Sequence, residues 1–270
     1  MLSLVLDNHS MVRLLLFLFA VTLFAGWELM RPRRELSLSK LMRWTNNWLL
    51  SILNSVLLSL VFPVLGVGVA LLAQEQGWGL LNALELHPAI AIALFIVLFD
   101  LAIYWQHRVY HMIPFLWRLH RVHHADPDYD VSTGIRFHPI SIMLSMLIKM
   151  AVIILLGPPP LAVLLAEIIL NVTAMFNHGN IYLPPGVDAF LRKFLVTPDM
   201  HRVHHSVIPE ETNSNFGFNF PWWDRLFGTY RAQPEGGHEN MEIGIRGFQH
   251  REAQMLHKLL LHPWLKGSGS

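Results

Sequence analysis

An apolar stretch of this sequence runs directly into two histidine motifs, in DLAIYWQHRVYHMIPFLWRLHRVHH (residues 100–124). His107 and His111 are four residues apart, so on a helix they lie on one face, one turn apart. Asp100 and Tyr104 continue the same stripe into the apolar stretch at helical spacing. The stretch therefore predicts a membrane helix whose end presents imidazole groups.

The second motif, HRVHH, occurs twice, at residues 120–124 and 201–205. In the first copy we expect His120 and His123 to share a helical face, with His124 pointing about 100° away. Such a triplet can supply two metal ions at once. One metal ion needs three or four imidazoles, so eight imply a pair of ions. The eight are His107, His111, His120, His123, His124, His201, His204 and His205.

Two further histidines are candidate ligands of the same site. His178 follows the last apolar stretch, and it is either a ninth ligand or a helix-end residue that hydrogen bonds to a carbonyl group. His138 precedes Pro139 and has three interpretations: a ligand, a donor to a ligand, or a helix cap. We include both among the expected metal ligands.

The composition favours lipid as the solvent for much of the surface. Hydrophobic residues make up 53% of the chain and charged residues 14%, whereas soluble domains carry about a quarter charged residues. Spanning a hydrocarbon core of about 30 Å takes about 20 apolar residues. The candidate segments are residues 14–27, 48–73, 88–106, 140–156 and 161–177. For the first of them a signal peptide is the competing interpretation.

The last two apolar segments form a predicted hairpin. Gly157 and three prolines join them, and proline cannot continue a helix. Each arm is near the lower length limit for a membrane span, so the hairpin either crosses the membrane or dips into it. Lys149 and Glu167 lie at similar depth on opposite arms, and we expect them to pair, because unpaired charges there are costly.

Basic residues predict the orientation. Arg31, Arg33, Arg34, Lys40 and Arg43 lie between the first two apolar segments, whereas residues 74–87 contain no basic residue. The positive-inside rule then places every histidine motif on the cytosolic face. The net charge of +1 provides no field that would attract nucleic acid, and the absence of cysteine excludes disulfides and thiolate metal sites.

The expected fold class is an all-α integral membrane protein. Four to five transmembrane or re-entrant helices are capped by a cytosolic helical domain that carries the histidine-ligated di-metal site. We expect N-terminal transmembrane helices over residues 1–88, a di-metal core over 89–231 and a cytosolic tail over 232–266. Residues 267–270, Gly-Ser-Gly-Ser, have the composition of an appended linker.

Together these motifs resemble the fatty acid hydroxylase / sterol desaturase superfamily of membrane di-iron oxygenases. The resemblance covers roughly residues 90–231. It is specific for the superfamily but does not identify the member. The matching segments are Asp100–His111, Trp117–His124, Arg136–Pro139, Asn177–Asn180, Thr197–His205, Asn215–Gly217 and Trp223–Tyr230.

The resemblance implies two iron ions, O2, two electrons and a lipid substrate taken from the bilayer. Members hydroxylate fatty acyl chains, desaturate or oxidise sterols, or cleave alkylglycerol ethers, and the motifs do not separate these reactions. Zinc can replace iron in purified protein, because imidazole binds both. The ceramide-type hydroxylases have a second histidine about four residues before the one that matches His178, where this chain has Ala174.

Beside the metals we expect Asp100, Tyr104 and Asp199 to take part in catalysis. Asp100 is either the partner of an arginine or an acceptor for the N–H of a ligand imidazole. The chain has no flavin or nicotinamide motif, so electrons come from an external donor, a ferredoxin or a cytochrome b5-like protein. Four arginines are either its docking surface or a solvated face: Arg202, Arg225, Arg231 and Arg246.

Outside the enzymes, a membrane metal transporter or storage protein is the alternative. A transporter needs acidic or histidine residues deep within its spans, whereas these histidines gather at one end. We therefore favour a lipid hydroxylase with a fixed metal site. The oligomeric state is left open.

Overall fold

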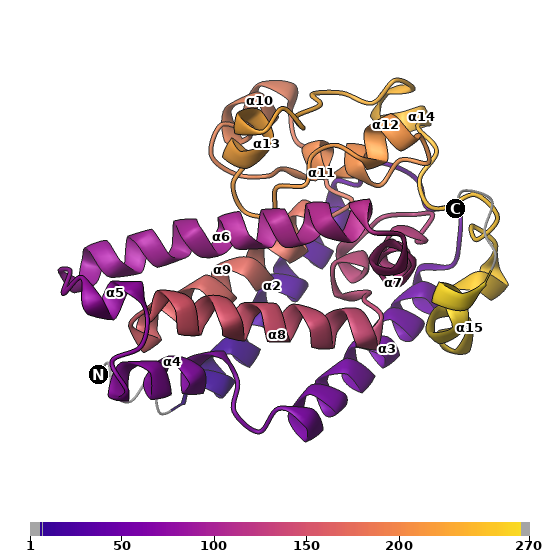
Figure 1. Ribbon diagram of the computed structural model, residues 1–270. Coiled ribbons are helices and arrows are strands. Elements are labelled where there is room, and N and C mark those ends of the chain that lie inside the picture. Colours follow the sequence, from indigo (N-terminus) through magenta and orange to yellow (C-terminus); the bar gives the residue numbers. More distant parts are fainter. Residues whose placement is uncertain (1–5, 7, 266–270) are drawn as a thin grey trace.

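The computed structural model describes Leu6 and residues 8–265, and the expected linker at 267–270 lies outside these residues. Five long helices dominate the part described (Figure 1). They are α2 (His9–Met30), α3 (Lys40–Val61), α6 (Pro88–Met112), α8 (Pro139–Leu156) and α9 (Pro160–Asn177). The expected all-α class is confirmed.

Shorter helices connect and cap the long ones. Before α6 come α4 (Gly66–Glu75) and α5 (Leu80–Ala83). After α6 come α7 (Pro114–His124) and the 3-10 turn η1 (Val131–Ile135). The remaining elements are α10 (Pro185–Leu191), α11 (Pro198–His204), α12 (Pro209–Thr212), α13 (Trp222–Leu226), α14 (Gly237–Asn240), η2 (Arg251–Gln254), α15 (Leu256–Leu261) and η3 (His262–Trp264).

Within the described residues, five segments are long and apolar enough to cross a membrane. The expectation of four to five spans is therefore confirmed. The second predicted span, residues 48–73, lies within the candidate span Lys40–Ala83, but the helix is interrupted there, because α3 ends at Val61 and α4 begins at Gly66. Pro63 explains the break, since it has no N–H to donate to the preceding turn.

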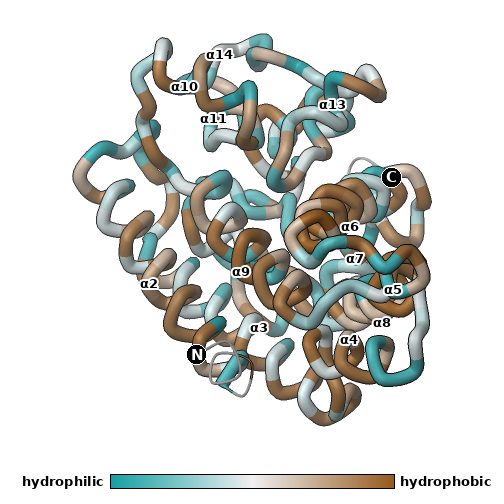
Figure 2. Tube along the Cα trace, turned by 90° about the vertical axis from the view of Figure 1, so that its left-hand side faces the viewer, coloured by the Kyte–Doolittle hydropathy of each residue, from teal (hydrophilic) through white to brown (hydrophobic). Residues whose placement is uncertain are grey.

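Helix α9 lies at the centre of the bundle. It packs against α2, α6 and α4, and it is the most buried of the candidate spans. Phe95 and Phe99 of α6 meet Ala162 and Ala166 of α9 in the largest apolar cluster. Figure 2 shows that apolar residues gather in these long helices, whereas hydrophilic residues are more frequent around α10 to α14.

The hairpin of α8 and α9 turns at Gly157, which has φ +58°. A Cβ atom there would lie 2.0 Å from the carbonyl oxygen of Trp78 and 3.0 Å from Cα of Gly79. The hairpin tip therefore packs on the turn between α4 and α5. With 18 residues each, both arms are about 27 Å long, close to the thickness of the hydrocarbon core.

Glu167 does not form the predicted ion pair with Lys149. Its Oε2 lies 2.7 Å from Nη1 of Arg13, because α2 packs along α9. Among the described residues Lys149 forms no ion pair within 4 Å, although Glu167 acts on it electrostatically. Arg13 is thus the partner that the sequence interpretation missed.

The segments from α10 to α14 lie together beside the end of α6 that carries the histidines (Figure 1). Residues 232–265 pack onto this region: Met241 and Ile243 contact Tyr129, and Leu259 contacts Leu50 of α3. The C-terminal segment is therefore part of the packed structure around the candidate site.

Candidate metal centre

The structure brings nine of the ten candidate histidines into two groups. In each group, one ring nitrogen per residue lies within 4.8 Å of all the others. All nine rings are buried except that of His111, which is half-buried. The first group is His107, His111, His120, His124 and His204; the second is His123, His178, His201 and His205.

Each HRVHH motif contributes to both groups. In α7, His120 and His124 belong to the first group and His123 to the second. The motif at the end of α11 does the reverse, with His204 alone in the first group. The predicted sharing of His120 with His123 on one face was wrong, because positions four apart on a helix differ by about 40° and positions three apart by about 60°.

Backbone carbonyl groups fix the orientation of four of the rings. Nδ1 of His107 lies 2.9 Å from the carbonyl oxygen of Phe216, and Nδ1 of His204 lies 2.7 Å from that of Ser214. Because a carbonyl oxygen only accepts, each Nδ1 carries the proton and each Nε2 carries a lone pair. The carbonyl groups of Thr133 and Ala174 do the same for His123 and His178, at 3.1 and 2.8 Å.

These lone pairs converge. Nε2 of His204 lies 2.9 Å from Nε2 of His107, and Nε2 of His178 lies 3.1 Å from Nε2 of His123. Two lone pairs cannot hydrogen bond to each other, so such contacts require a cation between them. Two nitrogens bonded at right angles to one ion, at about 2.1 Å, lie about 3 Å apart. The donor set therefore fits a metal ion in each group.

Several ring nitrogens in the groups have no hydrogen-bond partner within the described chain. They include Nε2 of His111 and of His120, and both ring nitrogens of His124 and His205. A buried polar atom without a partner costs about 1–3 kcal/mol. Metal ligation would satisfy one nitrogen of each of these rings, so the pattern supports the same conclusion.

Burial keeps the imidazoles neutral, which is the form that binds metal. Desolvation lowers the pKa of His178 to about 3. Burial first, and then the other histidines, hold the pKa of six more rings well below the ordinary value. These are His120, His123, His124, His201, His204 and His205.

Asp100 lies outside both groups, and neither interpretation of it matches its contacts. Its carboxylate accepts hydrogen bonds from the backbone N–H groups of Asn219 and Phe220, at 3.1 and 3.2 Å, and from the indole of Trp223 at 2.9 Å. Asp100 thus holds the loop that follows α12 against α6. That loop also carries Phe216, whose carbonyl group orients His107.

The side chains of Tyr104 and Asp199 also contact residues other than the clustered histidines. The Tyr104 hydroxyl lies 3.0 Å from Oγ1 of Thr229. Asp199 forms ion pairs with Arg202 and, at 3.3 Å, with Arg33. Within the described residues, no hydrogen bond joins either side chain to a histidine of the two groups.

His138 is the one candidate ligand that the structure does not bring into either group. It caps α8: its Nδ1 accepts a hydrogen bond from the N–H of Ile140 at 3.2 Å. Its Nε2 lies 3.2 Å from the carbonyl oxygen of Leu260. Both ring nitrogens of His138 therefore contact backbone groups. Of the three interpretations of His138, this agrees with the helix cap.

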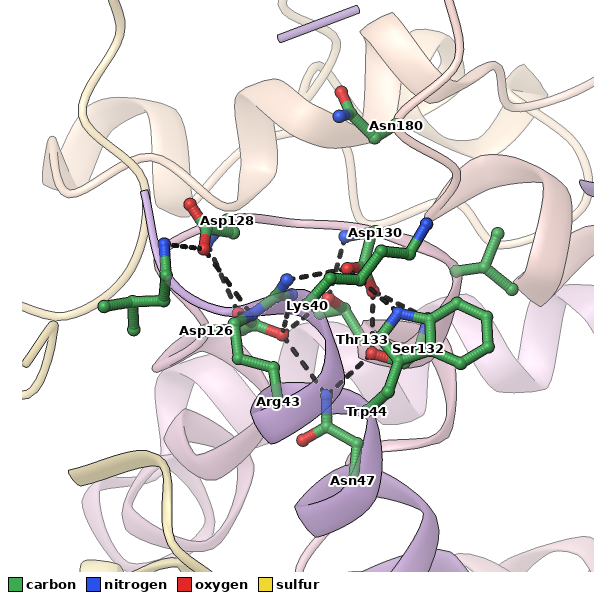
Figure 3. A network of polar contacts seen from close by, with 12 residues as sticks. Lys40, Arg43, Trp44, Asn47, Asp126, Asp128, Asp130, Ser132, Thr133 and Asn180 are labelled. Atoms are coloured by element: carbon green, nitrogen blue, oxygen red, sulfur yellow. Dashed lines mark hydrogen bonds and ion pairs between the residues drawn. The ribbon is translucent and has the colours of Figure 1, made fainter. Parts of the chain in front are cut away.

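A buried ionic network supports the second group, and the sequence interpretation missed it (Figure 3). Arg43 of α3 contacts Asp126 and Asp130, with Nη1 2.6 Å from Oδ2 of Asp130. Asp126 accepts a hydrogen bond from Oγ1 of Thr133 at 2.8 Å, and the Thr133 carbonyl orients His123. Burial alone would raise the pKa of Asp126, but Arg43 and Arg136 hold it well below its ordinary value. The available signal was the acidic run DPDYD (residues 126–130), one residue after the first HRVHH motif.

A cavity of about 170 Å³ opens beside the histidines, among α6, α8 and α9. Both groups reach its wall, through His107 and His120 of the first and His123 and His201 of the second. Phe137, which stacks on the His123 ring at 4.5 Å, also lines it. The remaining wall combines apolar side chains, such as Ile103 and Leu170, with polar ones, such as Ser145, from α6, α8 and α9.

A second cavity, of about 260 Å³, reaches the first group through His111. Trp117 lies in its wall, and its ring centroid is 4.7 Å from that of His111. The two cavities share no lining residue, so they reach different histidines.

The fatty acid hydroxylase family model matches residues 92–229. The chain is 31% identical over 160 residues to ornithine lipid hydroxylase OlsE of Rhizobium tropici, covering 59% of this chain and 46% of that protein. It is 28% identical over 167 residues to alkylglycerol monooxygenase of Xenopus tropicalis, covering 60% and 35%. It is also 28% identical over 161 residues to Delta(7)-sterol 5(6)-desaturase ERG3B of Gibberella zeae, covering 59% and 45%.

No solved structure matches the chain. The matched region spans less than half the length of each of these relatives. The family model covers about the region in which the motifs carry the resemblance, and it contains all nine clustered histidines. The chain therefore belongs to the fatty acid hydroxylase family.

Proposed function

We propose that this protein is a membrane-bound, O2-dependent di-iron oxygenase that hydroxylates a lipid. The observation that carries the proposal is the pair of buried imidazole groups that share α7 and α11 and border a cavity among membrane-spanning helices. An ornithine lipid hydroxylase among the relatives supports hydroxylation in particular.

Two iron ions fit the donor sets: the first would be held by the five-histidine group and the second by the four-histidine group. When bound, they supply the redox chemistry that activates O2 with two electrons. In the overall reaction one oxygen atom enters a C–H bond of the lipid, and the other leaves as water with two electrons and two protons. Zinc is compatible with the same imidazoles.

The chain's own residues exclude water and position the substrate. Burial of the rings keeps bulk water from the reacting centre. Phe137 and Phe218 provide apolar contact surface in the cavity, beside the histidines. A lipid chain that enters from the bilayer between α6 and the hairpin can therefore place one carbon at the imidazole groups.

The location and the electron donor are part of the proposal. The basic residues between α2 and α3 favour a cytosolic location for the histidine end. Electrons then come from a cytosolic ferredoxin or a cytochrome b5-like protein. Arg202 is fully buried beside Asp199, which removes it from the suggested docking surface.

Two other reactions remain within the proposed class. The sterol desaturase relative favours desaturation, and the alkylglycerol monooxygenase relative favours ether cleavage. Hydroxylation, desaturation and ether cleavage give different lipid products. Lipid mass spectrometry of cells that express the full chain, compared with cells that express His204→Ala, separates them.

A gain of one oxygen atom indicates hydroxylation, a loss of two hydrogen atoms indicates desaturation, and an aldehyde released from an alkyl lipid indicates ether cleavage. The exposed His250 provides a control, since His250→Ala should retain the product. A metal-binding protein without enzymatic activity would load two ions and leave every lipid unchanged, and that result would overturn the proposal.

A further inference from the structure

A polar stripe runs along helix α8, which is otherwise apolar. Ser141, Ser145 and Lys149 are spaced four residues apart, so they share one face of the helix. All three line the cavity that borders the histidine groups. Polar residues that face a cavity inside a membrane-spanning helix usually mark a functional path.

At its middle the stripe is satisfied by protein, because the Ser145 hydroxyl accepts a hydrogen bond from Nε2 of Gln106 at 3.0 Å. At the histidine end, the Tyr110 hydroxyl donates to the backbone carbonyl oxygen of Ser141 at 3.1 Å. The Tyr110 ring lies 5.7 Å from the His120 ring, so Ser141 is at the level of the metal ligands.

The far end of the stripe lacks such partners. Lys149 and, from α9, Asn171 both line the cavity. In the part of the chain that the structure describes, neither side chain has a hydrogen-bond partner, and Lys149 has no ion pair within 4 Å. Both offer N–H donors, which call for an acceptor in the cavity.

The local charges point to an anion. Arg13 and Glu167 neutralise each other at 2.7 Å, so Lys149 leaves one net positive charge. None of the described lining residues of the cavity is acidic. An uncompensated cation in a membrane-spanning helix is costly, and an anionic ligand group would remove that cost.

We propose that Lys149 and Asn171 form a subsite for the carboxylate of a lipid acid whose chain extends to the histidines. This inference rests on the proposed function, because it identifies the substrate class of the same cavity. Lys149 is eight residues from Ser141, so the carboxylate lies about 12 Å along α8 from the level of the metal ligands. Oxidation is therefore directed to a carbon remote from the acid group.

A carboxylate fits this position better than a lipid phosphate. Lys149 lies near the middle of α8, well inside the apolar span. A carboxylic acid can enter the hydrocarbon region in its neutral form and lose its proton beside the ammonium group. A lipid phosphate remains charged and stays with the headgroups at the interface.

Binding measurements on the full chain in neutral detergent test the subsite. Palmitic acid, its methyl ester and a dioleoyl phosphatidate are titrated as competitors of a fluorescent fatty acid. We expect palmitic acid to bind about tenfold more tightly than the ester, which is about 1.4 kcal/mol. Lys149→Met should abolish this preference and Lys149→Arg should keep it, whereas Lys193→Met, an exposed lysine, is the matched control.

Equal binding of the acid to Lys149→Met and to the unmodified protein would overturn the subsite, as would a Lys149-dependent preference for phosphatidate over palmitic acid. If Lys149→Met does not fold, Asn171→Leu should reduce the preference for the acid in its place. The measurement needs no turnover. If the protein prefers the acid but oxidises no lipid, the proposed function is rejected and the subsite is retained. If it oxidises a lipid without preferring the acid, the subsite is rejected and the proposed function is retained.

Discussion

Arg43 donates two hydrogen bonds to Asp126, from Nε to Oδ1 and from Nη2 to Oδ2, both at 2.7 Å. Neither side chain is exposed. Arg43 lies in α3, outside residues 92–229 that the family model matches, whereas Asp126 lies two residues after the end of the first HRVHH motif. The ion pair therefore ties the N-terminal helices to the loop that orients His123. Figure 3 shows Thr133 beside this pair.

Replacing Arg43 with methionine should destabilise the protein and weaken the second metal group. The change leaves Asp126 and Asp130 buried without their cation, and breaking a buried pair in this way costs about 3–5 kcal/mol. We expect a lower unfolding temperature in detergent and fewer than two metal ions per chain. Arg118→Met, which replaces an exposed arginine of the histidine-bearing helix α7, is the control. Full metal content and an unchanged unfolding temperature in Arg43→Met would contradict the role assigned to the ion pair.

The local part of this site could be predicted from the sequence. Helical spacing places His107 and His111 one turn apart on one face, and it divides each HRVHH motif between the two histidine groups. The long-range part could not. Arg43 and Asp126 are 83 residues apart, and charge alone does not say which arginine meets which aspartate.

Hydrogen-bond acceptors of the backbone are even harder to predict from a sequence than ion pairs between side chains. Four rings of the two histidine groups are oriented by the carbonyl groups of Thr133, Ala174, Ser214 and Phe216, and any residue type provides such a group. The fold shows the same limit. The apolar run over 48–73 indicated one span, but only the structure shows where Pro63 turns the chain.

Asp100 should matter for the first metal group although it touches no histidine. Its carboxylate accepts three hydrogen bonds from the segment Asn219–Trp223. A hydrogen bond to a charged group contributes about 1.5–3 kcal/mol. Asp100→Leu should therefore release this loop, shift the Phe216 carbonyl from His107 and reduce metal binding by the first group more than by the second.

Metal analysis of Asp100→Leu and Asp100→Asn checks this ordering. Asparagine has one acceptor oxygen, so it should retain part of the loop contact and an intermediate metal content. Loss of both ions to the same extent in Asp100→Leu would point to general unfolding, which circular dichroism of the same sample would reveal.

Asp224 gives a pH dependence with a definite sign. It accepts hydrogen bonds from the N–H groups of Phe216 and Gly217, yet burial raises its pKa from the ordinary value of 3.8 to about 6. The folded state therefore holds this proton more tightly than the unfolded state between about pH 4 and pH 6. Stability from this group is largest at low pH and falls by about 3 kcal/mol as the pH rises through that window.

Asp224→Asn cannot ionise and should lose this dependence. The unfolding temperature of the variant, relative to that of the unmodified protein, should rise between pH 4 and pH 7. Other titrating groups contribute equally to both proteins, so the difference isolates Asp224. A difference that stays constant over this range would show that Asp224 has an ordinary pKa in the folded protein.

His178 and His138 lie at matching ends of the hairpin, since His178 follows α9 and His138 precedes α8. We expect opposite results from their alanine variants. His178→Ala removes a ligand whose Nε2 lies 3.1 Å from those of His123 and His201, so the metal content should fall from two ions towards one and the lipid product should be lost. His138→Ala removes a helix cap worth about 1 kcal/mol, so it should lower the unfolding temperature and retain both ions. Elemental analysis of the two purified variants distinguishes these roles, and loss of metal from His138→Ala at an unchanged unfolding temperature would make it a ligand after all.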